Sequence, residues 1–263
     1  MRVPSDVVRD HWPEYLMEAA GLGLFMISAA VVTALLEYPH SPLYPLLPDP
    51  LIRRVLIGMA MGLTAIGIIY SPWGKRSGAH LNPAVTVTFF RLGKIQGLDA
   101  FFYVLAQFAG GLIGLLVATL AVGMAIEHPT VNYVVTVPGL EGAGVAFAAE
   151  VCISFGLMLV VLIASNHMKL NVWTGVFAGA LVAMYIAVEA PLSGMSMNPA
   201  RSFASALPAN LWTDFWVYLT APFLGMLIAA ECYVRFPGAR RVLCAKLYHD
   251  DDKRCIFCCS NMA

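Results

Sequence analysis

The chain has 263 residues, of which 59% are hydrophobic and only 12% are charged. A typical soluble domain carries roughly 25% charged residues, so this composition and a mean hydropathy of +0.74 predict a membrane protein. The 16 basic and 16 acidic residues cancel, which argues against nucleic acid or another polyanion as a partner. No cleavable signal peptide is expected, because Asp6 and Asp10 stand where a signal would carry basic residues.

Six apolar segments are long enough to cross a bilayer, which needs about 20 residues of helix. Each must be helical, since an open strand would leave backbone groups unpaired in lipid. They lie at roughly Glu14–Leu36, Leu51–Ile69, Ala100–Ala125, Gly142–Ser165, Val172–Ala190 and Asp214–Tyr233. The sequence therefore predicts an all-α membrane protein.

Two further apolar segments are too short to cross. One follows Asn82 and runs to about Phe90, and the other follows Asn198 and runs to about Leu207. A membrane tolerates such segments where they are buried in protein or line a water-filled cavity. We therefore predict two re-entrant half-helices in addition to the six transmembrane helices.

The distribution of basic residues predicts the orientation of the chain. The loops around Pro39–Pro50 and Glu127–Pro138 contain no Lys or Arg, whereas most basic residues fall in the terminal segments and the remaining loops. Basic loops stay on the cytoplasmic side, so both termini are expected there, with Arg53 and Arg54 as exceptions. The expected parts are a cytoplasmic tail over 1–13, a channel domain over 14–235 and a cytoplasmic tail over 236–263.

An internal repeat divides the channel domain into two units. GAHLNPAVTVTFF (Gly78–Phe90) parallels GMSMNPARSFASA (Gly194–Ala206), and EAAGLGLFM from Glu18 parallels EVCISFGLM from Glu150. The units, at about 14–125 and 142–235, each contain three spans, so the second enters the membrane from the opposite side. Inverted repeats of this kind place a functional site near the midplane.

The two Asn-Pro-Ala strings, each after a Gly and each in a corresponding half-span, resemble the paired signature of the aquaporin, or major intrinsic protein, family. The resemblance covers roughly Glu14 to Tyr233. It implies the aquaporin-like fold, a homotetramer with a separate pore in each subunit, passive transport and no cofactor. Ser202, Ala206 and the Phe215–Trp216 pair are similar to water-type rather than glycerol-type members.

The half-helices are expected to begin at these strings. Asn caps a helix N-terminus, and Pro is favoured in the first turn. Both positive helix ends would then point toward the midplane, where each Asn retains an amide N–H that can donate to water. The alternative is that both are ordinary caps. The pore motifs are Asn82, Pro83, Ala84, Asn198, Pro199 and Ala200.

By resemblance, the backbone carbonyls before each motif form a ladder of acceptors along the pore wall. Gly permits the turn that such a path requires. The predicted ladder residues are Gly78, Ala79, His80, Gly194, Met195 and Ser196. His80 could also act as a switch near neutral pH, although a static lining role is preferred.

Arg201 follows the second motif, and a charge at such depth is by default functional; the alternative is that it extends to the outer interface. The resemblance places it in the outer constriction with Met61, Ile186 and Met195. The Met61 assignment depends on a count across Ser71–Ser77, which is one residue longer than the family pattern. Because three of the four positions are apolar, strict selectivity for water is in doubt.

Glu18 and Glu150 stand in the first span of each repeat. A lone intramembrane carboxylate suggests proton coupling, but their repeat symmetry favours a structural role in which each accepts N–H bonds from an extended loop. Gln107, in the third span, is expected to be a polar packing contact.

Six cysteines complete the candidate list. None lies in a predicted outer loop, so a disulfide framework is not expected. In the polar tail, Cys255, Cys258 and Cys259 could bind metal or carry palmitate. No clear fourth zinc ligand accompanies them, so no metal site is assigned.

These observations predict a passive water channel that excludes ions and protons, in the lipid bilayer of the plasma (inner) membrane. One alternative is a channel for small neutral solutes such as glycerol, urea, ammonia or hydrogen peroxide. A second is a transporter that uses Glu18 or Glu150 to carry protons. An enzyme is not expected, because no nucleophile–base pair, phosphate loop or zinc motif is present.

Overall fold

A computed structural model describes residues 4–236, 241–249 and 252–259, and this part of the chain is helical with no β-strand. Six helices are long and apolar enough to cross a membrane. The elements are α1 (Pro4–Glu37), η1 (Tyr44–Leu46), α2 (Pro50–Tyr70), α3 (Pro72–Ser77), α4 (Pro83–Arg91), α5 (Gly97–Val122), η2 (Gly123–Glu127), η3 (Asn132–Val134), α6 (Ala143–Ser165), η4 (Asn171–Trp173), α7 (Thr174–Val188), α8 (Ala190–Ser193), α9 (Pro199–Ala209) and α10 (Phe215–Arg235). The predicted fold class is confirmed.

The first helix is longer than its predicted span. It begins at Pro4 rather than near Glu14 and continues through Pro13. The side chains of His11 and Tyr15 hold this extension to α5, because both bond to Asp99 Oδ1, at 2.7 and 2.6 Å. Apolar periodicity could not reveal the extension, since polar contacts fix it.

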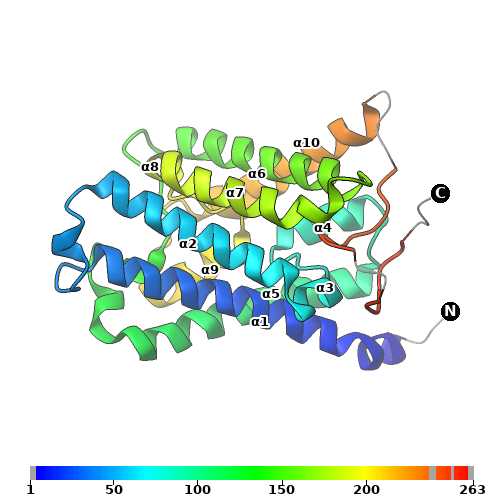
Figure 1. Cartoon of the computed structure of the whole chain (residues 1–263), viewed down its shortest axis with the longest axis horizontal. Helices are drawn as coiled ribbons and strands as arrows, with labels where there is room; N and C mark the ends of the chain where they lie inside the picture. Colours follow the sequence, from blue (N-terminus) through cyan, green and yellow to red (C-terminus); the bar gives the residue numbers. More distant parts are fainter. Residues whose placement is uncertain (1–3, 237–240, 250–251, 260–263) are drawn as a thin grey trace.

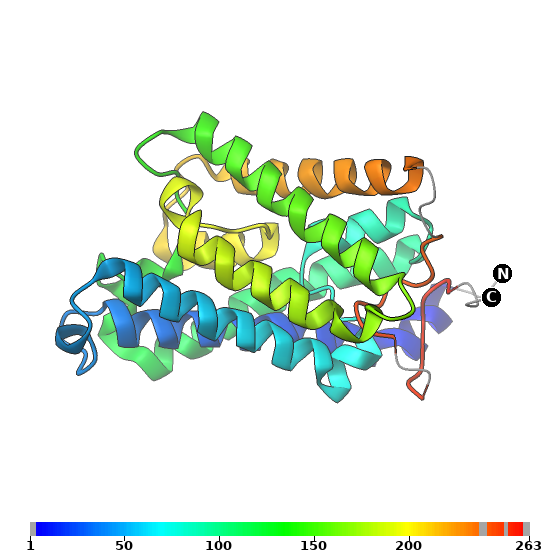
Figure 2. The same ribbon diagram turned by 45° about the horizontal axis from the view of Figure 1, so that its top comes forward.

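The long helices run side by side along the longest axis of the molecule, and both ends of the chain lie at the same end of the bundle (Figure 1). The short helices α4 and α9 lie inside, in opposite halves along that axis, and their N-terminal ends approach one another (Figure 2). This is the arrangement expected of two opposed half-helices.

Small residues let the long helices approach closely. On α1 and α5, a Cβ on Gly114 would collide with the backbone of Gly23. On α2 and α7, a Cβ on Gly62 would collide with the carbonyl oxygen of Gly179. Such backbone contact is typical of membrane helices, whose association depends on close packing.

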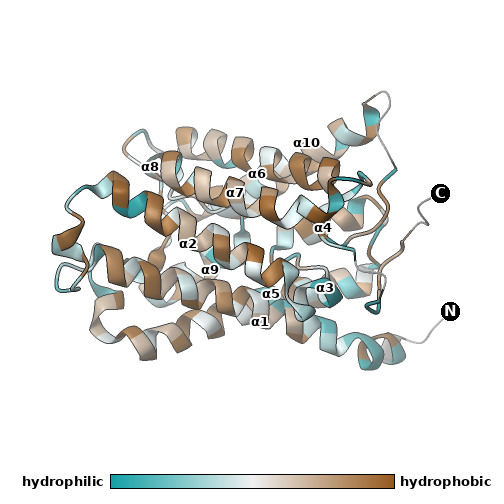
Figure 3. Cartoon of the chain, viewed as in Figure 1, coloured by the Kyte–Doolittle hydropathy of each residue, from teal (hydrophilic) through white to brown (hydrophobic). Residues whose placement is uncertain are grey.

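Polar residues gather at the two ends of the bundle, whereas apolar residues cover the helices between them (Figure 3). Arg53 and Arg54, the exceptions to the charge pattern, are bound within the fold. Arg53 Nε lies 3.0 Å from Glu37 Oε2, and Arg54 Nε donates to the carbonyl of Ala187 at 2.9 Å. These two side chains are therefore committed to internal contacts near the start of α2.

Candidate functional site

Both half-helices start at an Asn-Pro pair. Asn82 Oδ1 accepts the N–H of Ala84 at 2.8 Å, and Pro83 is the first residue of α4. Asn198 Oδ1 accepts the N–H groups of Ala200 and Arg201 at 3.1 and 3.2 Å, and α9 begins at the following proline. Each Asn is thus an N-cap, as the sequence predicted.

Each Asn also binds the loop of the other repeat. Asn82 Nδ2 donates to the carbonyl of Met197 at 2.7 Å, and Asn198 Nδ2 donates to the carbonyl of Leu81 at 2.8 Å. An amide nitrogen carries two hydrogens, so each Asn keeps a second donor after this exchange. The alternative, in which both Asn residues act only as helix caps, does not account for these reciprocal bonds.

The loops before the two caps adopt the same unusual backbone. Gly78 and Gly194 have φ of 93° and 78°. Further along, Ala79 and Met195 have φ of 53° and 51°, and the residues that precede each Asn have φ of 52° and 53°. Non-glycine residues in this region cost about 1–3 kcal/mol each and persist only where their surroundings hold them.

A buried carboxylate supplies that hold in the first repeat. Glu18 Oε1 accepts from Ser77 Oγ at 2.8 Å and from the N–H of His80 at 3.0 Å. Its Oε2 accepts from the N–H of Leu81 at 2.6 Å and from Gln107 Nε2 at 2.8 Å. Gln107 is therefore the fourth donor to Glu18, rather than a general packing contact.

The second repeat reproduces this arrangement. Glu150 Oε1 accepts from Ser193 Oγ at 2.7 Å and from the N–H of Ser196 at 2.6 Å. Its Oε2 accepts from the N–H of Met197 at 2.7 Å. Both carboxylate oxygens of Glu150 are thus engaged by donors of the second loop, as those of Glu18 are by donors around the first.

Two pairs of residues in this network were missed by the sequence reasoning. Tyr103 and Tyr218 donate their hydroxyls to the carbonyls of Ser77 and Ser193, at 2.7 and 2.6 Å. The signal was present, because both serines directly precede the loop glycine and both tyrosines follow an Asp by four residues. Aligning the third spans of the repeats would have found them.

A cavity of about 440 Å³ passes beside both caps. Its lining includes Glu37 and Pro50 at one end of the bundle, Asn82 and Asn198 in the middle, and Ile69 at the end where the termini lie. Met61, Ile186, Met195 and Arg201 all line this cavity, together with Gly78's neighbours Ala79 and His80, and with Gly194 and Ser196.

Two arginines line this cavity, Arg54 near the start of α2 and Arg201 in the first turn of α9. The chemistry of Arg201 follows from its guanidinium group. Its Nη1 is buried and has no hydrogen-bond partner within the described ranges. An unused donor facing a cavity can bind a polar molecule there. Arg201 as a whole is partly exposed, but the buried Nη1 favours the lining role over an extension to the outer interface.

His80 is enclosed on several sides. Its ring lies between those of Phe89 and Phe257, with centroids 5.1 and 5.4 Å away. Its Nδ1 lies 3.0 Å from Thr86 Oγ1, and its Nε2 donates to the carbonyl of Ala245 at 2.7 Å. These contacts favour the static role over the switch.

Glu189, between α7 and α8, is a buried carboxyl that the sequence analysis did not single out. Its side-chain oxygens lack a geometrically defined hydrogen-bond partner among the residues described. Burial raises the pKa of Glu189 to about 7. The Ser193 side chain acts in the opposite direction by less, and the charge of Glu150 makes a still smaller raising contribution. This carboxyl therefore titrates near neutral pH.

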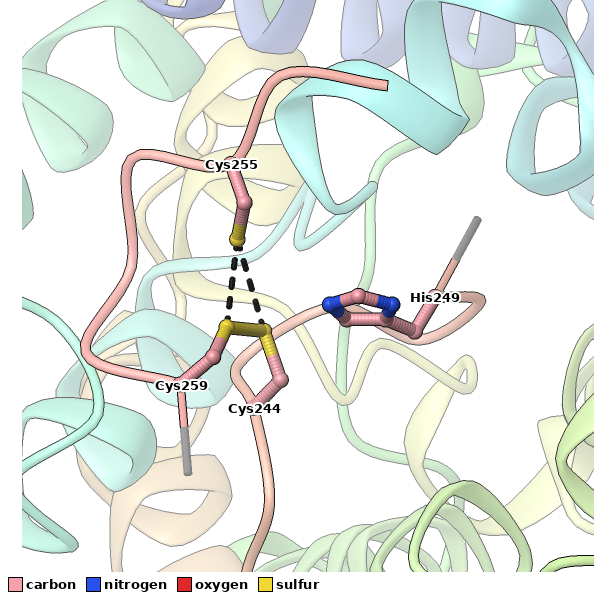
Figure 4. A group of neighbouring side chains, drawn as sticks. All are labelled: Cys244, His249, Cys255 and Cys259. Atoms are coloured by element: carbon pink, nitrogen blue, oxygen red, sulfur yellow. Dashed lines mark hydrogen bonds between the residues drawn. A yellow bond between two sulfur atoms is a disulfide. The ribbon is translucent and has the colours of Figure 1, made fainter. Parts of the chain in front are cut away.

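The tail departs from expectation. Cys244 and Cys259 form a disulfide, although none was expected. The segment folds back on itself, so cysteines 15 residues apart in sequence meet. The same fold brings His249 and Cys255 to this pair (Figure 4), a grouping that spacing along the chain could not show.

The family model described as Major intrinsic protein matches residues 8–233. The chain is 40% identical over 186 residues to Aquaporin NIP6-1 of Arabidopsis thaliana, covering 68% of this chain and 58% of that protein. It is 35% identical over 184 residues to Probable aquaporin AqpM of Archaeoglobus fulgidus, covering 67% of this chain and 74% of that protein. With Aquaporin NIP2-2 of Zea mays the identity is 30% over 241 residues, covering 90% and 78%.

The chain covers less than two thirds of the length of some plant relatives: 58% of Aquaporin NIP6-1, and 64% and 62% of two further plant aquaporins. Among solved structures, the X-ray structure of the aquaglyceroporin from Plasmodium falciparum matches with a TM-score of 0.70, covering 86% of this chain and 96% of that one. At 20% identity this match shows a shared fold.

Proposed function

Because the chain belongs to the major intrinsic protein family, a family of channels rather than enzymes, we propose that it is a passive channel that conducts water past its two Asn caps. The carrying observation is the reciprocal bonding of Asn82 and Asn198 beside a cavity that passes both. Each Asn uses one amide hydrogen on the opposite loop and keeps the other for a molecule in the cavity.

The two half-helices explain how ions would be excluded. Each helix N-terminus carries roughly +0.5 charge, and α4 and α9 meet at the caps. Arg201 adds a positive charge to the same lining. A cation would lose its hydration and meet repulsion, whereas water can exchange its hydrogen bonds for those of the Asn amides and loop carbonyls.

The proposed outer constriction comprises Met61, Ile186, Met195 and Arg201. Their shared place in the cavity lining supports it. The Gly62–Gly179 contact between the antiparallel helices places Met61 about six residues deeper than Ile186, a gap of about 9 Å at 1.5 Å per residue. Side chains tilt toward the N-terminus of their own helix, so those on α2 and α7 lean toward each other and reduce this gap.

A second candidate is conduction of small neutral solutes such as glycerol, urea, ammonia or hydrogen peroxide. Three constriction positions are apolar, and only Arg201 offers a charged donor there. An apolar wall fits the carbon face of a solute, while the polar groups of the solute need the Arg201 donor and the loop carbonyls to replace their lost hydrogen bonds with water. Proton-coupled transport is disfavoured, since the oxygens of Glu18 and Glu150 are occupied by loop donors.

We further propose a homotetramer with one pore per subunit, both termini in the cytoplasm and residence in the plasma (inner) membrane. Both ends of the chain lie at the same end of the bundle, which supports the proposal that both termini are on one side of the membrane (Figure 1). Native mass spectrometry would test the assembly, and protease access to terminal tags in sealed cells would test the orientation.

Stopped-flow light scattering of reconstituted vesicles tests the transport proposal. Sucrose measures water flux, and glycerol or urea then measures solute entry. We expect water permeability well above that of empty vesicles, without a proton current under a potassium–valinomycin potential. A chain ending at residue 240 should be measured in parallel, and failure of both chains to raise water or solute permeability would refute the channel.

A further inference from the structure

The described C-terminal segment, residues 241–249 and 252–259, lies across the end of the bundle where the termini are (Figure 1); we name it the tail segment. Leu243 N–H donates to Asn166 Oδ1 at 2.6 Å, directly after α6. Cys258 N–H donates to the carbonyl of Lys94 at 3.0 Å, between α4 and α5. The tail segment therefore bridges the two repeats.

Its interior residues enter the mouth of the cavity. Leu247 lines the cavity, and its N–H donates to the carbonyl of Gly78 at 3.1 Å. Ala245 accepts from His80 Nε2 at 2.7 Å, and the ring of Phe257 covers both His80 and Gly78. The tail segment thus forms hydrogen bonds with the carbonyl of Gly78 and the side chain of His80, two residues of the proposed ladder.

The tail segment has no helix or strand in its described residues. Several of its apolar side chains, among them Val242, Leu247 and Phe257, are buried against the bundle. Ordering each residue still costs about 1–2 kcal/mol of backbone entropy, which this burial must offset. Small units of structure commonly need a disulfide or a metal ion. A cross-link within the tail segment would therefore lower the entropy lost on ordering and add to the contacts that hold it in the mouth.

The cluster of Cys244, His249, Cys255 and Cys259 has the composition and spacing of a metal site. One ligand atom from each residue lies within 4.8 Å of all the others (Figure 4). Cys255 Sγ is 3.6 Å from Cys244 Sγ and 3.2 Å from Cys259 Sγ. Zn–S bonds of about 2.3 Å in a tetrahedron give S···S edges of about 3.8 Å, and three Cys with one His form an established structural zinc set.

We propose that Cys244, His249, Cys255 and Cys259 bind one zinc ion, which holds the tail segment in the cavity mouth and closes it. Binding requires three thiolates, so three protons leave as the ion enters. The disulfide between Cys244 and Cys259 is an alternative state of the same sulfurs, and zinc binds the reduced chain. Closure rests on the proposed channel function, whereas zinc binding does not.

Metal content tests the site without reference to transport. The full chain is purified in the presence of a phosphine reductant, and its zinc content is measured by mass spectrometry. Zinc is then exchanged for Co²⁺, whose visible spectrum reports the coordination geometry. We expect one zinc ion per chain and a tetrahedral Co²⁺ spectrum, both lost in Cys259→Ser. Cys258→Ser is the matched control, because this exposed cysteine is outside the cluster. A reduced chain that binds no added zinc, or a control that loses it equally, would overturn the site.

Vesicle swelling then tests closure. Chelation of zinc should raise water flux through the full chain and through Cys258→Ser, while Cys259→Ser should be open beforehand and unresponsive. A chain ending at residue 240 separates the two proposals. If neither this chain nor the chelated full chain conducts, the channel function fails while the zinc result stands. If the shortened chain conducts no faster than the zinc-loaded full chain, the tail segment does not close the pore.

Discussion

Replacing Glu150 with Gln probes the support of the second loop. The carboxylate accepts from Ser193 Oγ, Ser196 N–H and Met197 N–H, at 2.7, 2.6 and 2.7 Å. The amide oxygen of Gln could retain the two bonds now made by Oε1. Its NH₂ group would then face the N–H of Met197, where two donors meet and neither is satisfied.

The magnitude follows from those contacts. A hydrogen bond to a charged group contributes about 1.5–3 kcal/mol, and a buried donor without an acceptor costs a further 1–3 kcal/mol. We therefore expect Glu150→Gln to destabilise the fold by about 3–5 kcal/mol. For a chain of this size, that lowers the thermal midpoint by roughly 10 °C. Water flux should fall too, because Met197 also accepts from Asn82.

Thermal unfolding in detergent, followed by size-exclusion chromatography, measures the stability, and vesicle swelling measures flux. Glu189→Gln is the matched control, since it makes the same substitution at a buried carboxyl with no defined hydrogen-bond partner in the described structure and should not lower the midpoint. A Glu150→Gln protein with an unchanged midpoint would refute the bonding argument. A stable protein that lost pH-driven uptake would instead support the transporter alternative.

Three further predictions concern selectivity, charge exclusion and pH. Ile186→His should narrow the cavity and reduce glycerol flux relative to water; an unchanged ratio would remove this residue from the constriction. Arg201→Val should allow a small proton leak, measured with a pH dye, and addition of Asn198→Asp should raise cation leak by placing a carboxylate at the positive helix ends; no difference between the two would contradict the central barrier. Because the pKa of Glu189 is raised from 4.5 to about 7, its stabilising contribution is complete below about pH 4.5 and is lost as pH rises through 7. The thermal midpoint of Glu189→Gln should therefore lack this pH dependence and lie above that of the parent protein at pH values above 7. The corresponding difference in the free energy of unfolding is up to about 3 kcal/mol.

Much of the fold could be predicted from local patterns. Segment length and hydropathy predicted the six long helices, because a bilayer imposes a minimum helix length. The Asn-Pro strings predicted where α4 and α9 begin, since capping and the first-turn preference for Pro act within a few residues. Repeat symmetry then indicated that Glu18 and Glu150 share one role.

Tertiary structure alone decided the features that join distant segments. The Asn82–Met197 and Asn198–Leu81 bonds cross between repeats, and no spacing within either motif encodes them. The same holds for the tail segment, where the chain folds back to bring one side-chain atom from each of four distant residues within 4.8 Å of the others. Sequence patterns report the local preferences of helices and caps, whereas contacts between segments depend on how those helices pack in three dimensions.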